Sequence, residues 1–165
     1  YVSGAENVKM IGCNLSDNGS CVVPGPRLNH NFKLDHVKNV IVMDSRLVAS
    51  PFGSGLSVIR CQNVKITHCE IARNDWFGIH LASSREIMIS NCLIEANSSS
   101  GIYAECLYDG CEQVTVSGNI IQYNNGYGLE SYAGIDIKSI GNQYAGNGKS
   151  SQQEKVGSKR NILMN

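Results

Sequence analysis

The sequence has no net charge, only three prolines and no long apolar run. Fourteen basic residues balance 14 acidic residues among 165, and no basic cluster occurs before residues 155–160. A nucleic-acid partner would require a concentrated positive face, so this balance argues against one. A membrane-spanning helix needs roughly 18 or more consecutive apolar residues, so we expect no membrane span. Seventeen glycines with few prolines suit a turn-rich β fold.

Helical periodicity is also missing. No segment spaces apolar residues at i, i+3, i+4 and i+7 over a useful length. Apolar and polar residues instead alternate in short segments, such as 64–67 (VKIT) and 114–117 (VTVS). Such alternation is typical of strands that bury one face. The sequence therefore predicts an all-β protein.

One pattern recurs at an interval of about 23 residues, as in Val64 and Ile87. Further copies begin at Val8, Val40, Val114 and Ile137. Each copy holds three short strand segments separated by turns, and three strands with three turns make one triangular coil. Stacked coils pair as parallel sheets. We therefore predict a single-stranded right-handed parallel β-helix of about six coils of ~23 residues. The leucine-rich repeat frame is absent, and a propeller blade needs about 40 residues or more.

Two polar positions recur in successive copies. The first is a turn position, and it holds Asn18, Ser50, Asn74, Asn97, Asn124 and Asn147. The second is a small inward position, and it holds Cys13, Ser45, Cys69, Cys92, Asn119 and Asn142. Asparagine tolerates the left-handed backbone of a sharp turn and can bond to the asparagine one coil away. Cysteine packs as a compact hydrophobe. We interpret both rows as structural.

The cysteines give no sign of a metal site. There are seven, with no Cys-x-x-Cys zinc pattern, and we predict that all are reduced thiols. Asp35, His36 and Asp44 do not stack into a calcium cluster. We expect neither a metal nor a cofactor.

The repeat extends over the whole chain, so we predict one domain over residues 1–165, as a fragment of a longer chain. Both ends lack the polar caps that repeat arrays need. Residues 148–165 are predicted as an irregular tail or the start of a further coil.

Two intervals are longer than 23 residues, which indicates insertions near residues 24–31 and 107–110. We expect both insertions to leave the coil after the Gly-Ile-x-Leu strand and to flank the same edge of one sheet. Loops inserted in a repeat array commonly carry function.

The outward positions of that sheet form two rows with chemically competent side chains. One row reads Ser57, His80, Tyr103 and Glu130, and the next reads Ile59, Ala82, Glu105 and Tyr132. The Cα atoms of Glu105 and Glu130 should lie about 8 Å apart, and inverting glycoside hydrolysis uses two carboxyl groups roughly 6.5–9.5 Å apart. Alternatively, His80 and Tyr103 can act as base and acid in a lyase or an epimerase.

The candidate catalytic residues are thus Glu105, Glu130 and His80, and each of them can instead be an ordinary polar residue on a solvated sheet. Trp76, Tyr103, Tyr132 and Asp75 are candidate substrate-binding residues. Trp76 can instead pack on the neighbouring coil, and Asp75 can be a plain turn residue.

Residues 63–79 carry the pattern Asn-Val-x-Ile-x-x-Cys-x-Ile-x-x-Asn-x-x-x-Gly-Ile. With this pattern, the whole chain resembles the right-handed parallel β-helix superfamily of carbohydrate-binding and carbohydrate-processing proteins, which includes phage tailspikes, polysaccharide lyases, glycoside hydrolases and mannuronan epimerases. Residues 76–80 (WFGIH) are similar to the region where mannuronan epimerases carry an Asp-Pro-His motif. Here Leu81 and Ala82 follow the histidine, so that chemistry does not carry over. The polygalacturonase motifs are absent as well.

The resemblance implies an extended polysaccharide as partner, and three functions follow. The first is a protein that binds and cleaves or remodels the polysaccharide, as a tailspike-like depolymerase or as a secreted lyase, hydrolase or epimerase, in an extracellular or virion-associated setting. Reduced cysteines favour the tailspike, because virion proteins fold in a reducing cytoplasm, and uncapped ends suit a homotrimer. The second is a non-catalytic adhesin, and the third is an intracellular scaffold for protein interactions.

Overall fold

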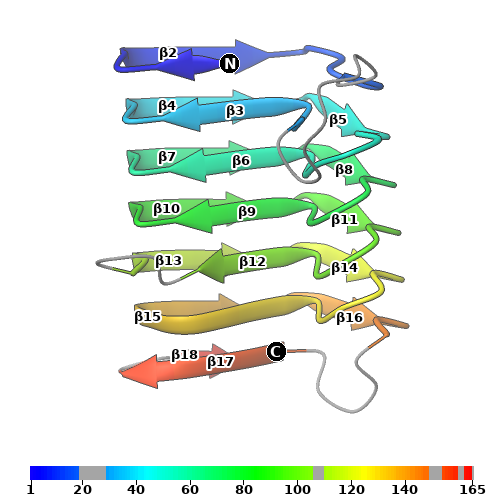
Figure 1. The fold of residues 1–165 in the computed structure, drawn as a ribbon. Coiled ribbons are helices and arrows are strands. Elements are labelled where there is room, and N and C mark those ends of the chain that lie inside the picture. Colours follow the sequence, from blue (N-terminus) through cyan, green and yellow to red (C-terminus); the bar gives the residue numbers. More distant parts are fainter. Residues whose placement is uncertain (19–28, 106–109, 149–153, 160–161, 165) are drawn as a thin grey trace.

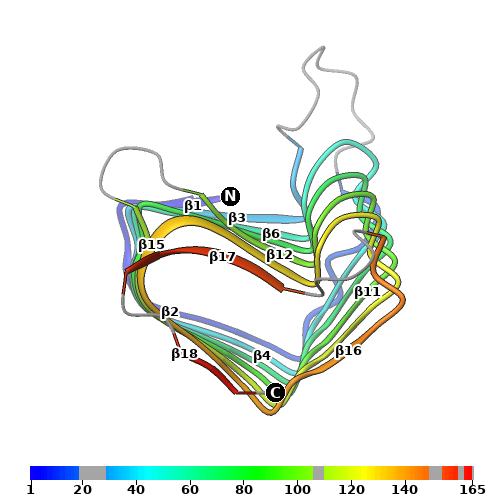
Figure 2. The same ribbon diagram turned by 90° about the horizontal axis from the view of Figure 1, so that it is seen from below.

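The alternating segments form strands that stack along one axis. The computed structural model describes residues 1–18, 29–105, 110–148, 154–159 and 162–164, and this part of the chain contains strands and no helix. Its strands belong to a 13-stranded and a 5-stranded sheet, and every pairing between strands is parallel. The coils lie one below another (Figure 1), and the view along the axis shows a three-sided prism (Figure 2). The predicted parallel β-helix is confirmed.

Each side of the prism is a ladder of strands from successive coils. Face 1 consists of β1 (Val2–Ser3), β3 (Phe32–Asp35), β6 (Leu56–Ile59), β9 (Ile79–Ala82), β12 (Ile102–Glu105) and the first part of β15 (Leu129–Ile140). Face 2 consists of β2 (Glu6–Ile11), β4 (Lys38–Met43), β7 (Gln62–Thr67), β10 (Arg85–Ser90), β13 (Glu112–Ser117) and the second part of β15. Face 3 consists of β5 (Arg46–Val48), β8 (Glu70–Ala72), β11 (Leu93–Glu95), β14 (Ile120–Gln122) and β16 (Gln143–Ala145). Below them, β17 (Glu154–Lys159) and β18 (Ile162–Met164) pair with β15.

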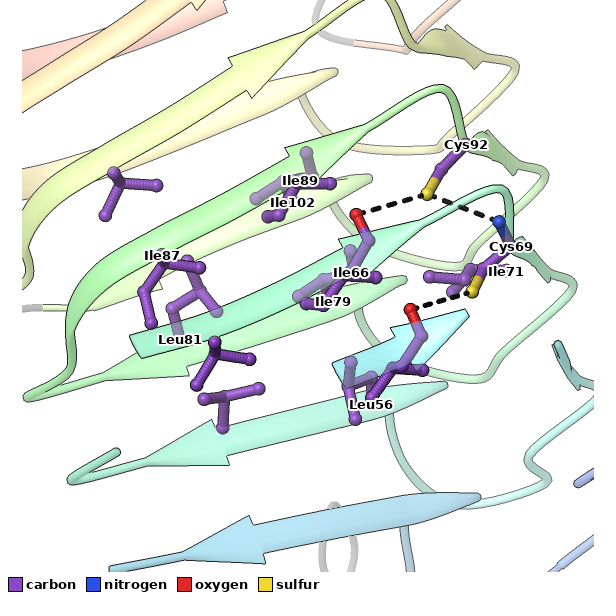
Figure 3. Close-up of a cluster of buried hydrophobic side chains, with 14 of the residues drawn as sticks. Leu56, Ile66, Cys69, Ile71, Ile79, Leu81, Ile87, Ile89, Cys92 and Ile102 are labelled. Atoms are coloured by element: carbon purple, nitrogen blue, oxygen red, sulfur yellow. Dashed lines mark hydrogen bonds between the residues drawn. The ribbon is translucent and has the colours of Figure 1, made fainter. Parts of the chain in front are cut away.

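The core fills the inside of the prism, because alternate residues of each strand point inward. Figure 3 shows Ile66, Ile79, Ile89 and Ile102 converging from faces 1 and 2, and each is 0% exposed. Gly78 lets neighbouring coils approach closely, since a Cβ atom there would lie 2.5 Å from the carbonyl oxygen of Gly101. The apolar half of the repeat thus accounts for the core.

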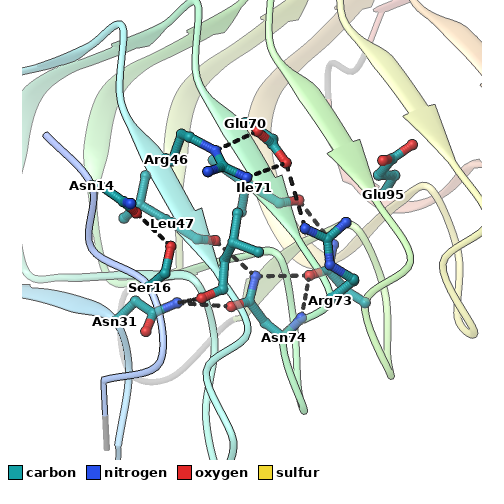
Figure 4. Close-up of polar contacts among 12 residues, drawn as sticks. Asn14, Ser16, Asn31, Arg46, Leu47, Glu70, Ile71, Arg73, Asn74 and Glu95 are labelled. Carbon is teal, nitrogen blue, oxygen red and sulfur yellow. Dashed lines mark hydrogen bonds and ion pairs between the residues drawn. The ribbon is translucent and has the colours of Figure 1, made fainter. Parts of the chain in front are cut away.

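The asparagine row is a hydrogen-bonded ladder, as predicted. Nδ2 of Asn74 donates to Oδ1 of Asn97 at 2.9 Å, and Asn97 donates in the same way to Asn124 at 2.8 Å. Ser50 occupies this row without an amide, and Asn31 supplies one from outside the row. Its Nδ2 donates to Oδ1 of Asn74 at 3.0 Å (Figure 4). The ladder therefore continues through a residue that the repeat does not include.

The cysteine row is also structural. The N–H of Cys69 donates to Sγ of Cys92 at 3.4 Å, and the N–H of Cys92 donates to Oδ1 of Asn119 at 2.9 Å. The five described cysteines, Cys13, Cys61, Cys69, Cys92 and Cys111, are free thiols, as predicted. Cys21 and Cys106 lie outside the described residues.

The prediction that both insertions flank one edge of a sheet is wrong. Along the chain, residues 19–28 come before β3, whereas residues 106–109 come after β12, so the two insertions do not both follow a strand of face 1. The third side of the first coil is described as far as residue 18, and in it the N–H of Leu15 donates to Arg46 O at 2.8 Å. Most of both insertions lies outside the described residues.

Candidate functional site

The outer surface of face 1 carries the predicted row in the predicted register. Lys33 aligns with Ser57, Ser57 with His80, His80 with Tyr103, and Tyr103 with Glu130. Glu105 aligns with Ala82 in the next row. The parallel register places these side chains on one face because each coil repeats the alternation of the last.

Aromatic rings cover the middle of this face. Phe77 stacks on Tyr103, with ring centroids 4.3 Å apart and planes at 16°. His80 lies between Trp76 and Tyr103, at centroid distances of 5.3 and 5.9 Å. Tyr132 meets Tyr103 edge-on at 6.1 Å. We call Trp76, Phe77, His80, Tyr103 and Tyr132 the aromatic cluster. Trp76 is half-buried within it, and Tyr132 is exposed.

A histidine–carboxylate pair lies at the centre of the cluster. Nε2 of His80 on β9 is 2.8 Å from Oε2 of Glu105 on β12. The side chain of His80 is 7% exposed, and that of Glu105 is 27% exposed. The imidazole is therefore buried behind a carboxylate that reaches solvent.

Burial fixes the protonation state of His80. Burial lowers its pKa more than the hydrogen bond and charge of Glu105 raise it, so the net shift is downward. Near neutral pH the ring is uncharged, and its one N–H is on Nε2, because the Glu105 carboxylate can only accept. Nδ1 is then an acceptor, and it has no hydrogen-bond partner among the described residues. Ser57 lies one coil away in the same row. Its hydroxyl is also buried and has no hydrogen-bond partner among the described residues.

His30 joins the cluster from the end of the first insertion. Its ring stacks on Trp76, with centroids 6.3 Å apart and planes at 18°. Its Nδ1 accepts the N–H of Ser54 at 3.0 Å. Burial, followed by the charges of His80 and Lys33, lowers the pKa of His30 to about 4. His30 thus packs against Trp76 as a neutral ring.

The second candidate carboxylate is bound elsewhere. Oε2 of Glu130 accepts the hydroxyl of Ser100 at 2.6 Å, and this hydroxyl also accepts the N–H of Tyr127 at 3.1 Å. Ser100 lies in the turn before β12, whereas His80 lies within β9, so the two glutamates have different partners at different places on face 1.

Most of the predicted site residues thus share one surface. The aromatic cluster contains four of them, His80, Tyr103, Tyr132 and Trp76, and Glu105 is hydrogen-bonded to His80. Asp75 is exposed in the adjacent turn, where its N–H donates to Ser50 O at 2.9 Å. The sequence interpretation overlooked Phe77 and His30. Phe77 follows Trp76 directly, and His30 lies in the first insertion, which was the available signal for it.

A separate pocket lies at the corner where face 1 turns into face 2. It is a cavity of about 880 Å³, lined by residues of four successive coils that include Arg60, Ser84, Arg85 and Glu112. In the described residues, no three His, Cys, Asp or Glu side chains converge to hold a metal ion. The described part of the chain also contains no helix long and apolar enough to cross a membrane.

The register, the core and the ladders agree with the comparison to known families. The model of the family described as "Right handed beta helix region" matches residues 1–162. The chain belongs to this family. Comparison with curated protein sequences finds no match.

Two solved structures of right-handed β-helix modules are similar to the chain. The A-module of the mannuronan C-5 epimerase AlgE6 from Azotobacter vinelandii is 16% identical, with a TM-score of 0.64 over 97% of this chain and 53% of that chain. The A-module of AlgE4 from the same organism is 14% identical, with a TM-score of 0.49 over 97% of this chain and 58% of that chain. The chain spans little more than half the length of these modules. At these identities the likeness concerns the fold.

Proposed function

We propose that face 1 binds an extended polysaccharide and acts on it by proton transfer through Glu105, which His80 holds in place. The observation that carries this proposal is the 2.8 Å bond between a buried imidazole and a carboxylate that reaches solvent. Membership of the β-helix family supports it, as does the likeness to a module titled as a mannuronan C-5 epimerase.

Glu105 and His80 have different roles in this proposal. An acid–base group must come within hydrogen-bond reach of the substrate, and Glu105 can do so because its side chain reaches solvent. His80 is too deeply buried to do so, and its Nδ1 is enclosed. The neutral imidazole donates to one carboxylate oxygen and fixes its direction, which leaves the other oxygen for the sugar. His80 is therefore a positioning residue.

The aromatic cluster supplies the binding surface. Trp76, Tyr103 and Tyr132 present apolar rings with polar edges, a combination that suits the C–H faces and hydroxyl groups of sugars. A chain lying along the axis meets a new coil about every 4.8 Å. Such a chain passes from Lys33 over Glu105 toward Glu130.

A positioned carboxylate that accepts or donates a proton takes part in the reactions of lyases, epimerases and hydrolases. A hydrolase would need Glu105 and Glu130 together. Glu130 is already bound to Ser100 at the edge of the face, so the geometry favours a reaction centred on Glu105. A hydrolase using both glutamates is the second candidate, because the two residues lie on neighbouring strands. An extracellular or virion-associated setting and a homotrimer belong to the same proposal.

Turnover of acidic and neutral polysaccharides by the wild type, Glu105→Gln and Glu95→Gln tests the proposal. Glu95 is the matched control, because on face 3 it also accepts a hydrogen bond from a side chain of a neighbouring coil, that of Gln122 at 2.8 Å. We expect Glu105→Gln to lose activity by about 100-fold or more, and Glu95→Gln to keep it. Binding without turnover by the wild type would refute the enzyme and support the adhesin. Equal activity of all three proteins would refute the role of Glu105.

A further inference from the structure

The pocket at the corner between faces 1 and 2 is more cationic than the protein as a whole. Its lining includes Lys38, Arg60, Arg85 and Glu112, that is, three cations and one carboxylate. The whole chain, by contrast, has no net charge. Lys38, Gln62, Arg85 and Glu112 follow one another in register, so this wall of the pocket has one polar side chain per coil, and three of the four are charged.

The three cations differ in whether a carboxylate of the protein already pairs with them. Arg60 is occupied by Asp35, because its Nη2 lies 2.8 and 2.9 Å from the two carboxylate oxygens. The Nζ atom of Lys38 lies 3.9 Å from Oε1 of Glu6, and both side chains are more than half exposed. The charge of Arg60 is therefore neutralised, and that of Lys38 is weakly paired.

Arg85 has a neutral partner instead. Its Nη2 donates to Oε1 of Gln62 at 2.9 Å, and Nε2 of Gln62 donates to Glu86 at 3.0 Å, which sets the direction of the amide. No carboxylate lies within 4 Å of the Arg85 guanidinium among the described residues. A guanidinium presents several N–H groups in a planar fork that matches the two oxygens of a carboxylate or a sulfate.

The hydroxyl of Ser84, which also lines the pocket, is already hydrogen-bonded within the protein. The Ser84 hydroxyl accepts the N–H of Cys61 at 3.0 Å and donates to Ala82 O at 2.9 Å. Of Arg60, Ser84 and Arg85, the guanidinium of Arg85 is thus the cationic group whose printed partner is neutral, and the complement of its charge is an anion.

The pocket is close enough to the site on face 1 to serve it. Ser83 lines the pocket and directly follows β9, which carries His80. Three residues of extended chain span about 10 Å. A sugar bound at Glu105 can therefore direct a charged substituent, or that of the next residue, into the corner.

We propose that the corner pocket is an anion-binding subsite that takes a carboxylate or sulfate group of the saccharide chain, with the guanidinium of Arg85 as its fork. The saccharide as the source of the anion rests on the proposed function, whereas the affinity of the pocket for an anion does not. Arg60 and Lys38 add positive potential, and Glu112 limits it at the lower end.

Calorimetric binding of a uronic-acid oligosaccharide, and of the neutral oligosaccharide made by reducing its carboxyl groups, tests the subsite. With the wild-type protein we expect the acidic oligomer to bind more tightly. Arg85→Gln should weaken its binding by about tenfold and leave the neutral oligomer unaffected. Arg85→Lys should fall between, because it keeps the charge and loses the fork. Arg46→Gln, which removes an exposed arginine on face 3, is the control and should change neither.

Equal affinity for the two oligomers, or equal effects of Arg85→Gln and Arg46→Gln, would overturn the subsite. The same measurements on Glu105→Gln separate this result from the proposed function. Loss of turnover with the charge preference retained supports both proposals. If neither oligomer binds, the saccharide proposal fails, and titration with inorganic sulfate then tests the pocket alone. Sulfate-induced shifts of the Ser83, Ser84 and Arg85 amide resonances that disappear in Arg85→Gln support an anion site. Unchanged spectra refute it.

Discussion

Nδ2 of Asn31 lies 3.0 Å from Oδ1 of Asn74, although 43 residues separate them along the chain. Asn31 thereby replaces the amide that Ser50 lacks, and it also donates to Val48 O at 2.9 Å. The same side chain accepts the N–H of Asn18 at 3.0 Å. One residue thus joins the end of the first insertion to the ladder of the next coils.

Asn31→Ala should lower the free energy of unfolding by about 1–3 kcal/mol, because it leaves the N–H of Asn18 without its acceptor and removes one of the two donors to Val48 O. Urea denaturation measures this change. Asn125→Ala, at an exposed position, is the control, and its effect should stay within about 0.5 kcal/mol. Equal losses in the two variants would show that Asn31 does not close the ladder.

The buried histidines should make the protein less stable in weak acid. His30 has its pKa lowered from 6.5 to about 4, and that of His80 is lowered too, so between these values the unfolded chain binds protons that the folded chain does not. Stability is therefore complete above pH 6.5 and falls as the pH drops toward about 4. For His30 alone, the loss between pH 6.5 and 5 is at most about 2 kcal/mol.

Urea denaturation of the wild type and His30→Gln at pH 7 and pH 5 measures this loss. The carboxylates of Asp35 and Glu70, whose pKa values are lowered from 3.8 and 4.5, titrate below this window. We expect the variant to lose less stability than the wild type between the two pH values. Identical losses would show that His30 is protonated in the fold at pH 5.

If the aromatic cluster binds the polysaccharide, removing the ring of Trp76 should weaken this binding while the protein still folds. Trp76→Ala should weaken binding of an active polysaccharide by about tenfold, since ring contacts contribute roughly 0.5–1.5 kcal/mol beyond area burial. Trp76→Phe should retain much of the affinity. Tyr123→Ala removes a 60% exposed ring at the end of β14 and serves as control. An equal effect of Tyr123→Ala would contradict a binding role specific to the cluster.

Two adjacent isoleucines on β14 test the inward and outward alternation. Ile121 is 0% exposed and Ile120 is 41% exposed. Ile121→Ala should cost about 2–5 kcal/mol of stability, because it leaves a cavity in the prism. Ile120→Ala should cost less than about 1 kcal/mol. Similar losses from the two substitutions, measured by thermal or urea unfolding, would contradict the assigned face.

The rows of face 1 could be predicted from the sequence, because residues one repeat apart occupy the same position in successive coils of a parallel, in-register stack. His80, Tyr103 and Glu130 fall in one row for this reason alone. The expectation that the first insertion follows the Gly-Ile-x-Leu strand is wrong, because a longer interval does not tell which of the three turns of a coil holds the extra residues. The sequence interpretation also missed His30 and Asn31, whose partners are set by the path of a turn and not by the repeat.

The alternation and the 23-residue interval by themselves determined the parallel β-helix, its inward residues and its outward rows, since burial of one side of each strand and pairing with the next coil leave one arrangement. Only the tertiary structure decided that His80 is enclosed by aromatic rings, that it binds Glu105 and not Glu130, and that Arg85 lines a pocket with a neutral partner. These features depend on side-chain conformations and turn paths across neighbouring coils, which periodicity does not specify.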